Sequence, residues 1–195
     1  MEEFILKIKK AFPYLTDTTI SKLMSLGEIQ VLQEGETFIK QGERHNRIAL
    51  VMQGLLRNYI MNDNGEQITV VFATELQSIA PYKCLFLQQP ASETTEAVKS
   101  SMLITFDYPT MRKLGEEEPE FNKLYMDALE KTLMNAIERV EDFTIAKPEE
   151  RYQRLLAKHG YLIEQAPLKY LASYLGINPV SLSRIRKRIS TGKKK

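Results

Sequence analysis

The residues whose types and spacing could do chemistry lie near the C-terminus, between Ala166 and Ile189. Apolar residues recur there at the spacing of one buried helical face: Leu168, Leu171, Ala172 and Leu175. Gly176 then allows a tight turn, and Asn178-Pro179 provides a cap and a first residue for a second helix. The second helix has its own apolar face at Leu182, Ile185 and Ile189. Two short helices joined through a glycine, the second one basic, are typical of a helix-turn-helix.

The opposite face of the second helix carries short hydroxyl side chains and cations. Hydroxyl groups allow close approach to a groove, arginine can bind a guanine edge with two hydrogen bonds, and lysine suits phosphate. A solvated basic tail is the alternative interpretation, but it does not explain the two apolar faces, the turn and the cap together. The residues that we expect to contact DNA are Lys169, Asn178, Val180, Ser181, Ser183, Arg184, Lys187 and Arg188.

The charge distribution favours the same function. The formal net charge of the chain is only +2, but from Gln165 to the C-terminus there are eight basic residues and no acidic one. They are Lys169, Arg184, Arg186, Lys187, Arg188, Lys193, Lys194 and Lys195. The preceding 164 residues therefore carry −6, because the total is +2 and the end contributes +8. An acidic body with one basic end suits a protein that presents a single surface to DNA.

Little in the sequence supports catalysis or metal binding. The two histidines, His45 and His159, lie in different predicted domains, and Cys84 is the single cysteine. We expect no catalytic residue, no metal and no cofactor, and therefore not an enzyme. An enzyme on a cupin-like barrel and a ligand-binding adaptor without DNA binding are the alternatives. An acidic N-terminus and the lack of any apolar run of about 20 residues predict a cytoplasmic protein without a membrane segment.

A long helix is predicted ahead of the helix-turn-helix. Pro119 is a favourable first helical residue, and after it apolar residues repeat at intervals of three and four. These residues are Met126, Leu129, Leu133, Ala136, Val140 and Phe143. Burial against the helix's own domain would be one use of them, but four more residues beside this seam are expected to pack on that domain: Leu124, Tyr125, Ala128 and Ile137. A helix with two apolar surfaces favours a dimer.

From Glu28 to about Tyr108 the pattern is that of short strands. Gly35, Gly42 and Gly54 separate apolar runs, and Asp63-Asn64-Gly65 predicts a tight hairpin. We therefore predict an α+β chain. Its parts are an N-terminal antiparallel β-roll domain over residues 1–118, a dimerisation helix over 119–146 and a helix-turn-helix domain over 147–195.

This order of parts resembles the Crp–Fnr superfamily of bacterial transcription regulators over essentially the whole chain. The matching motifs are Glu34-Gly35-Glu36, Lys40-Gln41-Gly42-Glu43, Gln53-Gly54-Leu55-Leu56-Arg57, Asp63-Asn64-Gly65-Glu66, Glu150-Arg151-Tyr152 and Leu171 to Ile185. The resemblance implies a cyclic-nucleotide-binding-type roll of the double-stranded β-helix kind. It further implies a homodimer that binds a palindromic site in double-stranded DNA and has RNA polymerase as a partner.

Two departures from the family pattern limit what the resemblance implies. Cyclic-nucleotide-binding members have a Gly-Glu pair for the ribose and an arginine followed by Ser or Thr for the phosphate. Here Glu75 has no glycine before it, and no arginine occurs between Arg57 and Arg112. Because a buried phosphodiester needs a charge partner, we expect no cyclic AMP binding of the usual kind. A pocket without arginine would take a neutral or apolar effector or none at all, and the residues expected to line it are Phe72, Ser92, Thr94 and Thr95.

The second departure concerns the DNA-reading helix. Many relatives carry an Arg-Glu pair early in it, where this chain has Pro179-Val180, and only the later Arg184 matches. The operator sequence therefore cannot be inferred from those relatives.

Overall fold

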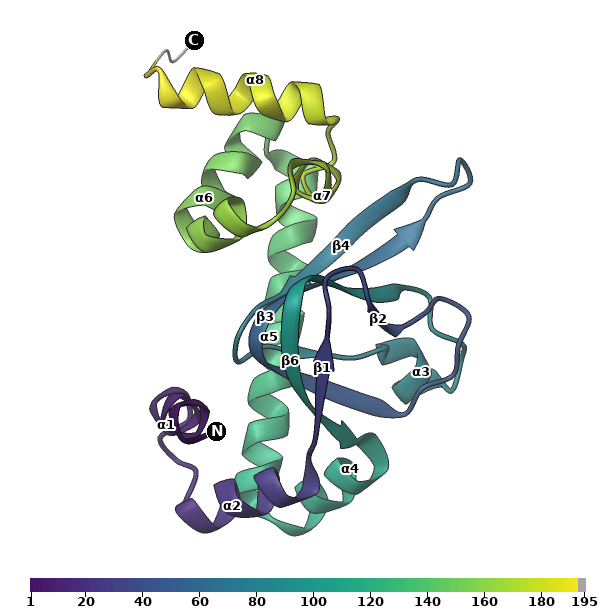
Figure 1. The fold of residues 1–195 in the computed structure, drawn as a ribbon, viewed down its shortest axis with the longest axis vertical. Helices are drawn as coiled ribbons and strands as arrows, with labels where there is room; N and C mark the ends of the chain where they lie inside the picture. Colours follow the sequence, from purple (N-terminus) through teal and green to yellow (C-terminus); the bar gives the residue numbers. More distant parts are fainter. Residues whose placement is uncertain (193–195) are drawn as a thin grey trace.

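The computed structural model describes residues 1–192 and shows a β-roll beside one long helix that leads to a group of three helices (Figure 1). Two short helices, α1 (Glu2–Ala11) and α2 (Asp17–Leu26), precede the roll. The strands of the roll are β1 (Glu28–Leu32), β2 (Thr37–Ile39), β3 (Arg47–Met61), β4 (Gln67–Ala73), β5 (Ser78–Ile79) and β6 (Thr94–Asp107). The short helix α3 (Tyr82–Leu87) lies between β5 and β6.

The six strands form one antiparallel sheet around the two longest, β3 and β6. The order of the main strands is β1-β6-β3-β4, with β2 paired to β6 and β5 paired to β3. The pairing of β3 with β6 shifts register at several points between Val51 and Leu56. Such irregularities bend a strand, and here they let the sheet close into a roll. The predicted hairpin is confirmed, because β3 and β4 pair on either side of the turn at Asn62–Glu66.

Two apolar cores stabilise the roll and the helices beside it. Side chains inside the roll form the first core: Leu32, Phe38, Ile39, Ala49, Val51, Leu56, Ala73, Ile79, Ala91, Ala97 and Leu103. The second core lies where α1 and α2 meet β6 and the next two helices, α4 (Tyr108–Glu117) and α5 (Pro119–Ile145). Phe121 is almost fully buried there and anchors the start of α5.

The long helix α5 begins at Pro119, as predicted, and ends at Ile145. Its 27 residues extend about 40 Å at the usual rise of an α-helix. Leu124 and Tyr125 pack on the N-terminal part of the molecule, as expected. The expectation for Ile137 was wrong: its side chain is 40% exposed, because it lies on the face of α5 that is turned away from the roll.

The last three helices are α6 (Pro148–Gln165), α7 (Leu168–Tyr174) and α8 (Pro179–Ser190). They share a core in which Leu171 and Leu182 are almost completely buried. Leu55 and Val98 of the roll belong to the same core, so the three helices are packed against the sheet as well as against each other. None of the helices within residues 1–192 is long and apolar enough to cross a membrane.

Candidate DNA-binding site

Helix α8 presents an exposed polar surface that is held in place by a buried apolar one. The side chain of Asn178 caps the helix, since its Oδ1 accepts the N–H of Ser181 at 2.8 Å. Leu182 and Ile185 are buried against α6 and α7. Most of the residues predicted to contact DNA point away from that core: Val180, Ser183, Arg184 and Lys187 are exposed and Ser181 is half-buried. The structure therefore brings these side chains together on one face of α8.

Three cations on α8 are free to bind an anionic partner. Within residues 1–192, the side chains of Arg184, Arg186 and Lys187 make no hydrogen bond and no ion pair. Arg186 was not among the predicted contacts, because on a helical wheel it lies near the border of the buried face. Its length nevertheless carries the guanidinium into solvent, a behaviour that is common for long cationic side chains.

Arg188 was predicted to contact DNA, but its side chain forms an ion pair within the protein. Its guanidinium donates hydrogen bonds to both carboxylate oxygens of Glu149, in the first turn of α6. Both side chains are about one-third exposed. The ion pair fastens α8 to α6, so Arg188 positions the helix while the three free cations face outward. Lys193, Lys194 and Lys195 lie outside the described residues.

The turn between α7 and α8 is fixed by residues from α5 and α6. Arg151 of α6 donates to the carbonyl oxygen of Leu175 at 2.9 and 3.1 Å and to that of Ala146 at 2.8 Å. Gly176 has a φ of +67°, and a Cβ at this position would lie 2.6 Å from the ring of Phe143. Phe143 was predicted for the dimer seam, yet its ring packs beside this turn while remaining 45% exposed.

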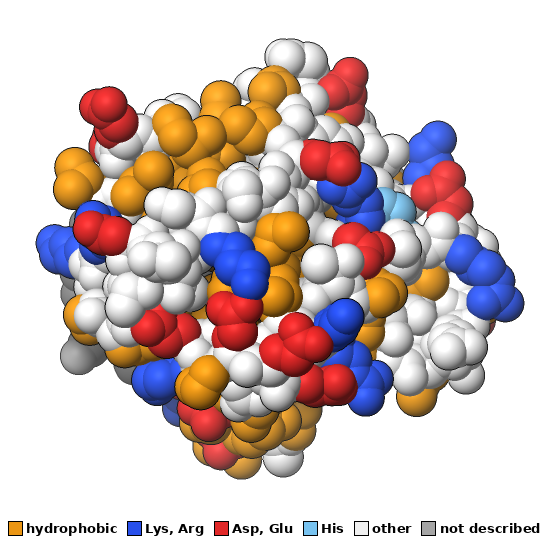
Figure 2. All heavy atoms as spheres, turned by 90° about the horizontal axis from the view of Figure 1, so that it is seen from below, with side chains coloured by type: hydrophobic (Ala, Val, Ile, Leu, Met, Phe, Trp, Pro, Cys, Tyr) orange, Lys and Arg blue, Asp and Glu red, His pale blue; other side chains and the backbone are white. Residues whose placement is uncertain are grey.

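One predicted DNA contact, Lys169, lies on α7, whereas the others lie on α8 or at its cap. Lys169 is exposed near the start of α7, with its Nζ 4.6 Å from the ring centroid of Tyr170. In a helix-turn-helix the first helix crosses the DNA backbone, so this ammonium group has a suitable place for phosphate. At the opposite end of the molecule, acidic and basic side chains are interspersed, and no field of one sign is visible (Figure 2).

The predicted dimer seam lies along the outward face of α5. Met126, Leu133 and Val140 are 44%, 60% and 66% exposed, whereas Leu129 is half-buried. Ala136 is exposed as well, and Ile137 adds to the same apolar strip. A continuous exposed apolar strip of this kind marks an interaction surface.

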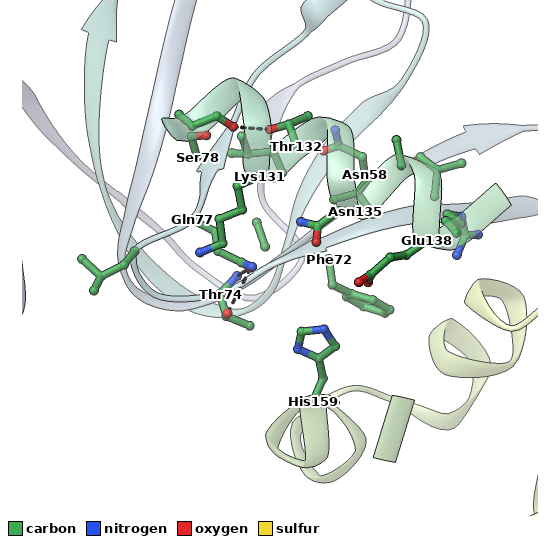
Figure 3. Close-up of a pocket in the computed structure, with 18 of the residues that line it drawn as sticks. Asn58, Phe72, Thr74, Gln77, Ser78, Lys131, Thr132, Asn135, Glu138 and His159 are labelled. Carbon is green, nitrogen blue, oxygen red and sulfur yellow. Dashed lines mark hydrogen bonds between the residues drawn. The ribbon is translucent and has the colours of Figure 1, made fainter. Parts of the chain in front are cut away.

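A cavity of about 1250 Å³ lies between the roll, α5 and α6 (Figure 3). Its polar lining includes Asn58, Thr74, Gln77, Ser78, Lys131, Thr132, Asn135, Glu138 and His159. Partial burial, with Lys158 nearby, lowers the pKa of His159. Arginines also reach the cavity, although none occurs in the segment between Arg57 and Arg112, because α5 and α6 supply them. Arg139 donates to the carbonyl oxygen of Thr69, and Arg154 pairs with Asp142.

The structure does not bring the four predicted pocket residues together. Phe72 lines the cavity and packs on Tyr174. Ser92, Thr94 and Thr95 lie elsewhere, each engaged by a neighbour. Thr94 Oγ1 accepts the N–H of Gln41 at 3.0 Å, the hydroxyl of Thr95 donates to Asn58 Oδ1 at 2.8 Å, and that of Ser92 donates to Glu93.

Clustered metal ligands do not occur in the part of the chain that the structure describes, where no three His, Cys, Asp or Glu side chains come together. Cys84 is half-buried, and its Sγ accepts the N–H of His45 at 3.1 Å. His45 itself packs edge-on against Phe38, and burial lowers its pKa.

Comparison with protein families identifies the N-terminal part. Residues 29–118 match the family described as cyclic nucleotide-binding domain. The roll is therefore similar to cyclic nucleotide-binding domains. No curated protein matches the sequence.

Solved structures extend the likeness to most of the chain. FixK2 from Bradyrhizobium japonicum has a TM-score of 0.73 at 13% identity, with 85% of each chain covered. The c-di-GMP responsive global regulator CLP of Xanthomonas campestris has a TM-score of 0.70 at 11% identity, covering 91% of this chain and 93% of its own. The Thermus thermophilus catabolite activator protein scores 0.57 at 17% identity, covering 93% and 86%. All three belong to the Crp–Fnr regulators, so the chain has the fold that the sequence motifs indicated.

The turn of the helix-turn-helix provides a test of this geometry. Gly176→Ala should lower the free energy of unfolding by about 1–3 kcal/mol, because it adds a clash with Phe143 to the strain of a positive φ. Gly192→Ala is the matched control, since Gly192 has the same φ of +67° and no described atom within 4 Å of the place that a Cβ would take. Urea unfolding followed by circular dichroism measures both. Equal losses for the two variants would contradict the close contact with Phe143.

Proposed function

We propose that this protein is a homodimeric transcription regulator that binds a palindromic operator through α8. The observation that carries the proposal is the outward face of α8, where Arg184, Arg186 and Lys187 are exposed without partners among the described residues. The hydroxyl groups of Ser181 and Ser183 lie on the same helix and allow close approach to a groove. Arginine provides direct base contacts and lysine provides phosphate contacts, so one face supplies both parts of DNA recognition.

The division of labour follows the three parts of the chain. We assign effector sensing to residues 1–118, dimerisation to 119–146 and DNA binding to 147–195. Pairing of two copies along the apolar strip of α5 would place two α8 helices in successive major grooves, about 34 Å apart. By family resemblance, RNA polymerase is the protein partner and the cytoplasm is the location.

Any effector is expected to differ from cyclic AMP. The cavity between the roll, α5 and α6 is lined by amides and hydroxyls such as Asn58, Thr74 and Gln77. Of the cations that line it, Arg139 and Arg151 are bonded to backbone carbonyls, Arg154 to Asp142 and Lys158 to Glu138, and among the described residues only Lys131 makes no ion pair. These contacts favour a neutral ligand over a phosphodiester, which would find Lys131 alone unpaired and would have to displace existing partners of the other cations.

DNA binding is tested by Arg184→Ala. The loss of one base-contacting guanidinium should cost roughly 1–3 kcal/mol at an operator selected from random DNA and less on unselected DNA. Arg112→Ala is the control, since Arg112 is an exposed arginine on α4 paired with Glu116. The wild-type affinity should also fall steeply with salt, each phosphate contact contributing about −0.9 to the log–log slope. An affinity unaffected by salt would contradict the proposal.

Dimerisation is tested by Leu133→Glu. Placing a charge in the centre of the apolar strip should convert the dimer to a monomer and weaken operator binding, because a buried carboxylate without a partner is costly. Leu6→Glu serves as the control, because Leu6 is a leucine of α1 with a similar exposure, 66% against 60% for Leu133. Light scattering gives the mass of each variant. A Leu133→Glu protein that remained dimeric would show that the strip is not the interface.

The effector expectation is tested by isothermal titration of the purified protein with cyclic AMP. We expect no heat of binding up to millimolar nucleotide, because the chain lacks the Gly-Glu and Arg-Ser elements of cyclic-nucleotide-binding relatives. Micromolar binding would overturn this expectation and leave the DNA-binding proposal unaffected.

A further inference from the structure

One charged side chain of the roll is completely buried, and it lies on the outer face of the sheet. Arg57 of β3 has an exposed fraction of 0%. One of its terminal nitrogens donates to Thr69 Oγ1 at 3.2 Å, and the other binds Gln67 and both carboxylate oxygens of Glu96 at 3.3 and 3.4 Å. Arg57 and Glu96 are directly paired residues of β3 and β6, so the ion pair is built into the register of the sheet.

The helix that covers this arginine belongs to the DNA-binding part. The ring of Tyr170, on α7, lies 3.5 Å from the guanidinium carbon of Arg57, and Tyr59 lies 4.3 Å away on the sheet. The hydroxyl of Tyr170 donates to Glu96 Oε1 at 3.2 Å. The planar guanidinium is thus stacked on two aromatic rings and paired with a carboxylate, an arrangement that lysine cannot reproduce.

Further hydrogen bonds join α7 to β4, which is an edge strand of the main sheet. The N–H of Thr69 donates to Ser173 Oγ at 2.7 Å, and the hydroxyl of Ser173 donates to the carbonyl oxygen of Gln67 at 3.1 Å. Arg139 of α5 donates to the carbonyl oxygen of Thr69 at 3.2 Å. At Gln67 and Thr69 the polar backbone groups of this edge are therefore satisfied by the helices rather than by another strand.

The polar contacts restrict movements of α7 along the sheet that the apolar contacts alone would allow. Leu55, Val98 and Phe72 pack against the C-terminal helices, and apolar surfaces of this kind tolerate small shifts. A shift of α7 along the sheet would separate Tyr170 from Glu96 and leave a buried charge with fewer partners, which is unfavourable. The set of Arg57, Glu96 and Tyr170 therefore admits one position of α7. Because the turn at Gly176 is fixed by Arg151, the position of α7 sets that of α8.

We propose that Arg57, together with Glu96 and Tyr170, positions the recognition helix: the clamp formed by these three residues sets the distance and orientation at which α8 meets DNA. Arg57 lies far from α8 in the sequence, is completely buried and acts through α7. The proposal rests on the proposed DNA-binding function for its consequence, but the clamp itself can be measured without DNA.

The first measurement is amide hydrogen exchange at Thr69, whose N–H is bonded to Ser173 of α7 and so reports docking directly. We expect Arg57→Met to increase the exchange rate of this amide at least tenfold. Tyr170→Phe retains the ring and loses only the bond to Glu96, so a few-fold increase is expected. Arg47→Met is the matched control, because Arg47 lies at the far end of the same strand and is paired with Glu28. Tyr170→Phe decides the question if Arg57→Met does not fold.

The second measurement is the preference for half-site spacing. Operators with the half-sites moved apart by one and by two base pairs are titrated with each protein. We expect the wild type and Arg47→Met to bind these operators more weakly than the operator with the native spacing. In Arg57→Met and Tyr170→Phe the ratio of the two affinities should be about tenfold smaller. The clamp would be overturned if Arg57→Met and Tyr170→Phe showed the same exchange rate at Thr69 and the same spacing preference as Arg47→Met. A wild-type protein that binds no DNA would instead contradict the proposed function, while the exchange measurement would still decide on the clamp.

Discussion

The arrangement of the whole molecule depends on the contact between α7 and the outer face of the roll. There the sheet presents a buried cation, Arg57, and the helix presents the aromatic ring that covers it, Tyr170. Each side depends on the other: without the helices the apolar residues Leu55 and Val98 would be exposed, and without the sheet α7 would lose its packing against these two residues. Because α8 is joined to α7 through a rigid turn, this contact also fixes where the free cations of α8 point.

The same constraint separates the functional surfaces. Docking of α7 occupies the outer face of the sheet, so α5 is left with two different sides. Its inward side borders the cavity with Lys131 and Asn135, and its outward side is the apolar strip around Leu133. The apolar strip and the exposed cations of α8 are therefore different surfaces of one small chain, while Ala136, Val140 and Phe143 belong both to the predicted seam and to the lining of the cavity. The helix α5 contacts all of the parts that would have to move together if one of these partners altered the binding of another.

Local signals in the sequence were enough to predict the helix-turn-helix, and contacts between distant residues were not. The Asn178 cap, Gly176 and the apolar spacing of α8 act within a few residues, so the turn and both helices were predicted correctly. The partner of Arg188 is Glu149, 39 positions away, and the neighbour of Phe143 is Gly176, so neither role could be derived from spacing. The pocket residues were chosen from a family position, yet the side chains of Thr94 and Thr95 are engaged by Gln41 and Asn58. Nothing in the pattern around Arg57 distinguishes a buried arginine from a surface one.

In the proposed dimer, two α8 helices read two related half-sites. Hydroxyl-radical footprinting of the purified protein on a DNA fragment that it selects from a random library tests this claim most directly. We expect two protected patches on one face of the duplex, related by two-fold symmetry and about one helical turn apart. A single patch, or cleavage identical to that of free DNA, would contradict it.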